Sequence, residues 1–84
     1  MIEGSLQISA TREGYVVTFT PYAVEHSPSV ELRLSNRQAV ADFIQEIGTR
    51  TARMIKAMDD LRETGAAFLP TVFLTPGQRE LFHS

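Results

Sequence analysis

Between Ser35 and Gly65 the sequence carries one long amphipathic pattern, which restricts the possible folds more than any other feature. Apolar or small residues recur there at alternating steps of four and three, namely Val40, Ile44, Ile47, Thr51, Met54, Met58 and Leu61. This spacing places them along one face of an α-helix. We therefore predict a single helix over residues 36–64, with its apolar face packed against the rest of the chain.

Both ends of this predicted helix carry terminal signals. Ser35 can cap the first free N–H groups, and Gln38 stands where it would complete a capping box. Gly65 lies where a left-handed residue commonly ends a helix. A straight helix of this length measures about 43 Å, whereas a compact globule of this chain length is only about 30 Å across. The helix must therefore bend, or it must extend beyond the rest of the fold.

Gly48 divides the predicted helix into two halves with different patterns. The first half has a broad apolar face, which is typical of a helix that lies on a sheet. In the second half the face narrows toward Met54, Ile55, Met58 and Leu61, as in a seam between helices. Because glycine costs about 1 kcal/mol relative to alanine inside a helix, Gly48 needs a reason. Close packing against a neighbouring element is the first explanation, and a kink is the alternative.

Three short segments before the helix alternate between apolar and polar residues. Residues 5–11, 15–20 and 30–34 fit strands by this period-two pattern. Short links between successive strands favour an antiparallel meander, whose apolar face must be covered by another layer. The sequence therefore predicts an α+β fold in one small domain over residues 1–84, in which a three-stranded antiparallel meander is packed by one long amphipathic helix.

Residues 66–84 form a C-terminal arm that is rich in apolar residues. Its first part fits a fourth strand, which Pro70 would restrict to a sheet edge or an extended arm. Thr75 then begins a predicted short terminal helix, with Pro76 in its first turn and Gln78 closing a capping box. The arm could pack on its own chain, on a second copy or on a different protein, and the pattern leaves these three alternatives open.

Composition limits the support available to so small a core. A chain of this length buries only roughly 60–65% of the surface that its unfolded form exposes. The sequence contains no cysteine, so disulfides and thiolate metal sites are excluded, and a partner is the expected source of extra stability. We see neither a secretory signal nor an apolar stretch of about 18 residues that could span a membrane. A cytoplasmic location is therefore the default expectation.

Groups that could carry catalysis or bind a metal are few. Glu25 and His26 could act together as a general base or a metal ligand, although a single histidine in a polar loop is usually only solvated. Asp59, Asp60 and Glu63 could bind a cation, but without a loop that offers further oxygen atoms they fit a solvated helix face better. No recognised catalytic motif occurs. We expect no enzymatic activity, no cofactor and no bound metal.

A local basic arc on the predicted helix gives the best indication of contact with an anion or with nucleic acid. It consists of Arg50, Arg53 and Lys56. Glu46 and Asp60 lie four residues from Arg50 and Lys56, so much of this charge can be balanced within the helix. The formal net charge of −2 is also unlike the basic domain of a typical nucleic-acid binder. A nucleic-acid-binding regulator is therefore the alternative function.

Our first hypothesis is a non-enzymatic interaction or regulatory protein that acts as a homodimer. It would contact another macromolecule as an adaptor, inhibitor or modulator. Its basis is the apolar surface on the second half of the helix and on the arm, which would need a partner if it stayed exposed. We expect the interface to contain Thr51, Met54, Ile55, Met58, Leu61, Phe68, Phe73 and Phe82.

Overall fold

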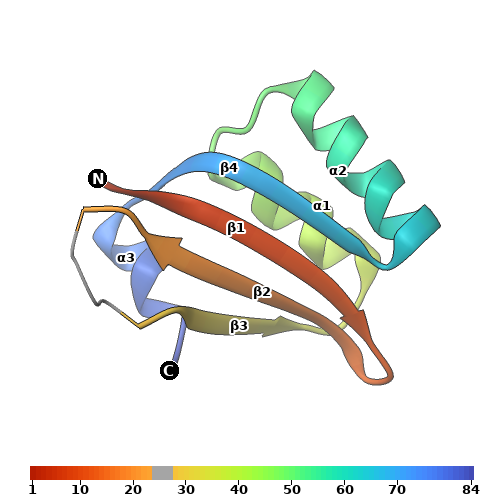
Figure 1. Cartoon of the computed structure of the whole chain (residues 1–84), viewed down its shortest axis with the longest axis horizontal. Coiled ribbons are helices and arrows are strands. Elements are labelled where there is room, and N and C mark those ends of the chain that lie inside the picture. Colours follow the sequence, from red (N-terminus) through yellow and green to blue (C-terminus); the bar gives the residue numbers. More distant parts are fainter. Residues whose placement is uncertain (24–27) are drawn as a thin grey trace.

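The computed structural model describes residues 1–23 and 28–84, and these residues form two layers. A four-stranded antiparallel sheet makes one layer, and helices cover one of its faces (Figure 1). The arrangement agrees with the predicted α+β class. In chain order the elements are β1 (Ile2–Thr11), β2 (Gly14–Pro21), β3 (Val30–Leu34), α1 (Arg37–Glu46), α2 (Thr51–Thr64), β4 (Ala66–Leu74) and α3 (Pro76–Glu80).

The sheet has the strand order β3-β2-β1-β4, so the last strand lies beside the first. The first three strands form the predicted meander, and β4 pairs antiparallel with β1. The start of the C-terminal arm therefore packs on its own chain, which was the first of the three alternatives. Pro70 lies on an edge strand, as its missing N–H group requires.

A β-bulge interrupts the pairing between β1 and β4. Gly4 lies opposite Val72 and Leu6 lies opposite Leu69, so Pro70 and Thr71 together face a single residue of β1. The bulge is needed because Leu69 and Val72 are three residues apart and yet both are buried. Without the extra residue, strict alternation would send one of them to the outer face of the sheet.

The single helix predicted over residues 36–64 is wrong, because the chain forms two helices, α1 and α2, separated at Gly48. Gly48 adopts a left-handed conformation with φ +83°. A Cβ atom at this position would meet no other atom within 4 Å, so close packing does not explain the glycine. The longest extent of the structure is 33 Å, less than the roughly 43 Å of a straight helix. The left-handed glycine ends α1 and allows α2 to turn back.

The helix ends agree with the sequence signals in two places and differ in one. α1 is capped by Asn36 and not by Ser35, since Asn36 Oδ1 accepts a hydrogen bond from the Ala39 N–H at 2.8 Å. Gln38 donates to Asp42 and makes no capping box. α2 ends at Gly65 with φ +80°, and α3 has the complete capping box between Thr75 and Gln78. Both of these ends confirm the prediction.

The hydrophobic core lies between the helices and the inner face of the sheet. Phe82 closes it near the C-terminus, where its ring centroid lies 6.0 Å from that of Phe19 and 5.7 Å from that of Phe43. No helix formed by the described residues lies on the outer face of the sheet, which is seen from the front in Figure 1. The largest fully buried side chains are Phe19, Leu6, Ile8, Ile44, Leu74, Val17, Val30 and Val40.

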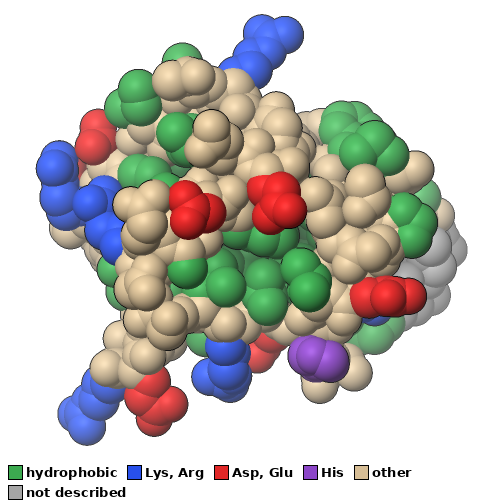
Figure 2. Space-filling view, turned by 180° about the vertical axis from the view of Figure 1, so that it is seen from behind, with side chains coloured by type: hydrophobic (Ala, Val, Ile, Leu, Met, Phe, Trp, Pro, Cys, Tyr) green, Lys and Arg blue, Asp and Glu red, His purple; other side chains and the backbone are tan. Residues whose placement is uncertain are grey.

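The helix layer covers the core incompletely. Seen from the helix side, hydrophobic side chains gather in a hollow near the centre of the molecule, and two acidic side chains border it (Figure 2). Several residues packed against the core keep part of their surface exposed, among them Leu32, Leu34 and Ile47. In the part of the chain that the structure describes, no helix is long and apolar enough to cross a membrane.

Candidate functional site

Two of the eight predicted interface residues lie in the core of the chain itself. Leu61 and Phe82 are each only 3% exposed, so neither side chain can meet a partner, and this part of the prediction is wrong. Leu61 is one helical turn from the buried Ala57, on the face of α2 that packs inward. The second half of the amphipathic pattern therefore covers the chain's own core.

The other α2 residues of the predicted interface vary in exposure. Met54 and Met58 are half-buried against the core, and Arg37 Nη2 donates a hydrogen bond to the Met58 carbonyl at 2.9 Å. Thr51 and Ile55 are exposed, with 54% of Ile55 accessible. Only a narrow part of the α2 surface is thus both apolar and accessible.

Phe68 and Phe73 lie on the outer face of the sheet, on either side of the bulge, with 58% and 46% of their surface exposed. Tyr22, which is 50% exposed, joins them because its hydroxyl donates a hydrogen bond to the Pro70 carbonyl. We call these three residues the aromatic patch. The sequence did not identify Tyr22, since its contact with β4 depends on the bulge and on the pairing of distant strands.

Both edges of the sheet are partly occupied by the chain itself. On β4, Arg53 Nη1 donates to the Thr71 carbonyl at 3.2 Å, and Thr64 Oγ1 bonds both backbone groups of Ala66. On β3, Glu31 and His83 exchange two backbone hydrogen bonds of 2.7 Å. Such contacts remove free backbone groups on which another strand could pair. The outer face of the sheet is therefore more available to a partner than either edge.

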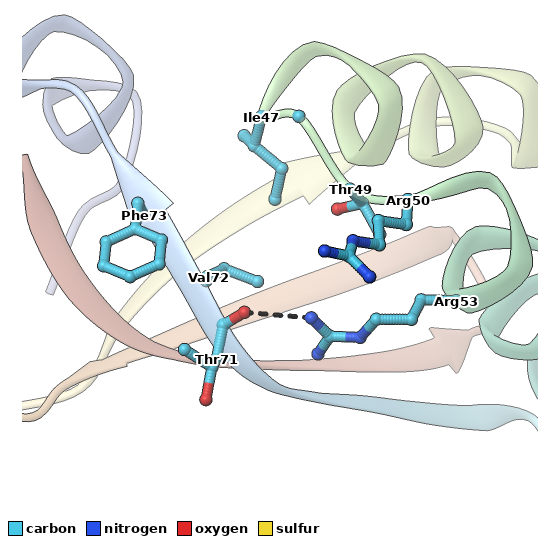
Figure 3. A pocket seen from close by; sticks show the side chains of 8 residues that line it. Ile47, Thr49, Arg50, Arg53, Thr71, Val72 and Phe73 are labelled. Atoms are coloured by element: carbon cyan, nitrogen blue, oxygen red, sulfur yellow. Dashed lines mark hydrogen bonds between the residues drawn. The ribbon is translucent and has the colours of Figure 1, made fainter.

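A cleft of about 350 Å³ lies between the start of α2 and β4. We call it the α2–β4 cleft. The side chains of Arg50 and Arg53 extend from α2 toward the strand, and Arg53 is hydrogen-bonded there to Thr71 (Figure 3). Among the ion pairs between described residues, neither arginine has a carboxylate within 4.0 Å. The lining residues are Ile47, Gly48, Thr49, Arg50, Arg53, Thr71, Val72 and Phe73.

The predicted basic arc is only partly assembled. Lys56 does not line the cleft, and its Nζ lies 2.9 Å from Asp60 Oδ2. The hydrogen bond and the charge of Asp60 raise the pKa of Lys56. The expected balance between Glu46 and Arg50 is lost, because the helix breaks between them and the two residues no longer lie one turn apart. The structure therefore brings Arg50 and Arg53 together but leaves Lys56 outside.

The acidic residues of α2 are engaged in surface ion pairs. Arg62 Nη2 lies 3.4 Å from Asp59 Oδ1 and 4.0 Å from Glu63 Oε1. Within the two described ranges, no group of three or more histidine, aspartate or glutamate side chains could hold a metal ion. The proposed pair of Glu25 and His26 lies outside the described residues.

Comparisons of this chain with protein-family models, with curated proteins and with solved structures give no match. Its function therefore has to be inferred from its own surfaces. Among the described residues, the aromatic patch on the sheet and the α2–β4 cleft with its two arginines carry chemistry that a partner or ligand could use.

Proposed function

We propose that this chain is a non-enzymatic interaction protein that acts as a homodimer, and that two copies associate through the aromatic patch. The observation that carries the proposal is the position of three large aromatic side chains, each about half exposed, on the uncovered face of the sheet. Aromatic residues are enriched at protein interfaces and dominate their binding energy. Exposed apolar side chains gathered on one face are typical of a site of association.

The patch suits a second copy of the same chain because a two-fold interface repeats each contact. Phe68 and Phe73 flank the bulge, so a copy turned by 180° can place Phe68 of one protomer against Phe73 of the other. Phe73 lies opposite Glu3 and Phe68 lies opposite Gln7 in the β1–β4 pairing. The same rotation therefore brings Glu3 toward a neutral glutamine and avoids a contact between two carboxylates.

The hydrophobic hollow on the helix side is a less suitable self-association surface. Two acidic side chains border it (Figure 2), so a second copy placed there would bring the acidic groups of both protomers into one interface. Like-charge contacts of this kind weaken association. With the dimer formed through the sheet, the helix layer stays free to contact another macromolecule, as an adaptor or modulator would require.

The test is the molar mass in solution, measured by sedimentation across the micromolar range. We expect a dimer for the unmodified chain and a monomer for the double variant Phe68→Ser/Phe73→Ser. Loss of one interface hot spot costs about 2 kcal/mol or more of binding free energy, which raises the dissociation constant of the dimer roughly 30-fold. Circular dichroism should show that the double variant stays folded, since both side chains are exposed.

Ile55→Ser provides the matched control, because Ile55 is as exposed as the two phenylalanines but lies on α2. This variant should remain dimeric. If Ile55→Ser dissociates the dimer while the double variant does not, the interface lies on α2 and the aromatic patch is the wrong surface. If the unmodified chain is a monomer at every concentration, the homodimer proposal is wrong.

A further inference from the structure

We infer that the α2–β4 cleft binds the phosphoryl group of a small organic phosphomonoester, with Arg50 and Arg53 as its cationic ligands. The two side chains enter the cleft from the same end of α2, and no carboxylate of the described residues lies within 4.0 Å of either one. Guanidinium groups bind phosphate oxygens through paired, charge-assisted hydrogen bonds. This binding site adjoins the proposed dimer interface, because Phe73 lines the cleft and also belongs to the aromatic patch.

Arg53 is held in place before any ligand arrives. Its Nη1 donates to the Thr71 carbonyl at 3.2 Å (Figure 3). A guanidinium has five N–H donors in a planar fork, so this bond fixes the group and leaves other donors free. Fixing a side chain in advance lowers the entropy cost of binding. The strand thereby positions one of the two cations that would meet the phosphate.

Arg50 occupies a position that disfavours a cation. It is the N-cap of α2 and makes no side-chain capping bond, whereas serine, threonine, aspartate and asparagine are preferred there. The positive end of a helix also destabilises a nearby positive charge, and Arg53 follows one turn later. Departures from local preference of this kind are expected at functional sites. An anion in the cleft would relieve the repulsion of the two arginines by each other and by the positive end of α2.

The size and lining of the cleft favour a small organic phosphate. Its volume of about 350 Å³ falls within the roughly 300–1,000 Å³ typical of small-molecule sites. Ile47, which is only partly buried, adds apolar surface for an organic group. A nucleic-acid strand would need a row of cations along its backbone, but Lys56 is paired with Asp60 and lies outside the cleft.

The test is a titration with phenyl phosphate at constant ionic strength, followed by backbone amide NMR shifts of the full chain. We expect saturable shifts centred on residues 49–53 and 71–73. Arg50→Ser should weaken binding about tenfold or more, because a charge-assisted bond is lost. The same substitution should raise the thermal unfolding midpoint of the unliganded protein, because serine is a better N-cap. The lost binding would then not be a consequence of unfolding.

Arg62→Ser is the matched control, since Arg62 lies on the same helix but outside the cleft. The affinity of this variant for phenyl phosphate should equal that of the unmodified chain. Absence of saturable shifts, or equal binding by Arg50→Ser, would overturn the site. Equal affinity for inorganic phosphate and phenyl phosphate would overturn the organic part of the assignment. Tighter binding of a single-stranded oligonucleotide, weakened by Lys56→Ala, would replace the proposal with a nucleic-acid interface.

Discussion

The ring of Phe82 lies between those of Phe19 on β2 and Phe43 on α1, and so joins the C-terminal segment to both layers of the fold. Its neighbour Leu81 is 50% exposed. The two residues are adjacent and similarly apolar, and nothing in their local sequence distinguishes the buried one. The local sequence therefore predicts an interface position for Phe82, whereas its side chain belongs to the core.

We predict that Phe82→Ala lowers the free energy of unfolding by about 3–5 kcal/mol, because it removes a buried ring and leaves a cavity. Leu81→Ala should change the free energy of unfolding by no more than about 0.5 kcal/mol, as expected for a surface position. Urea unfolding of both variants measures the difference. Similar small losses in the two variants would show that Phe82 is not packed as described.

At the scale of elements, the break between α1 and α2 has a local cause. Gly48 adopts a left-handed φ of +83° in open space, so backbone conformation and not packing selects glycine. Most other residues pay about 1–2 kcal/mol for this conformation, whereas asparagine tolerates it.

We therefore predict that Gly48→Ala destabilises the chain by about 1 kcal/mol and that Gly48→Asn costs distinctly less. Gly77→Ala is the control, because Gly77 is in α3 and a Cβ there would make only an ordinary contact of 3.9 Å with Thr75 Oγ1. The thermal unfolding midpoints of the three variants give the order of their stabilities. A stabilising effect of Gly48→Ala would instead mean that a continuous helix competes with the broken one.

Local patterns predicted those elements whose signals are local. The alternation at Val17 and Phe19 identified β2, and Thr75 and Gln78 identified the start of α3. At Gly48 the sequence predicts at most a kink and not a break, because the pattern of apolar residues continues across it at helical spacing. Apolar residues of α1 before the break and of α2 after it both face inward, so periodicity alone could not separate one helix from two.

The sequence identified only some residues of the candidate sites, as it identified only some elements of the fold. Arg50 and Arg53 were identified as a possible anion contact, and Phe68 and Phe73 as apolar surface. Thr71 and Tyr22 were not identified from the sequence. Thr71 reaches the cleft, and Tyr22 reaches Pro70, only because β1 pairs with β4. Contacts between segments far apart in the chain have no signature in a local pattern.

At the scale of the whole molecule, the sheet joins the two ends of the sequence. β1 pairs with β2 on one side and with β4 on the other, and pairings between distant segments slow folding because a large loop must close first. We predict refolding in milliseconds to seconds after rapid dilution from urea, measured by stopped-flow fluorescence of the tyrosines. Refolding in microseconds would show that the β1–β4 pairing does not limit the rate.

The central position of β1 also has a consequence for synthesis of the chain. β1 emerges early and can pair with β2 at once, but the strand that covers its other side is translated only after both long helices. During that interval β1 is an unprotected sheet edge, which can pair with the wrong strand or with another nascent chain. The pairing of β4 with β1 is therefore the last strand pairing of the sheet that the growing chain can make.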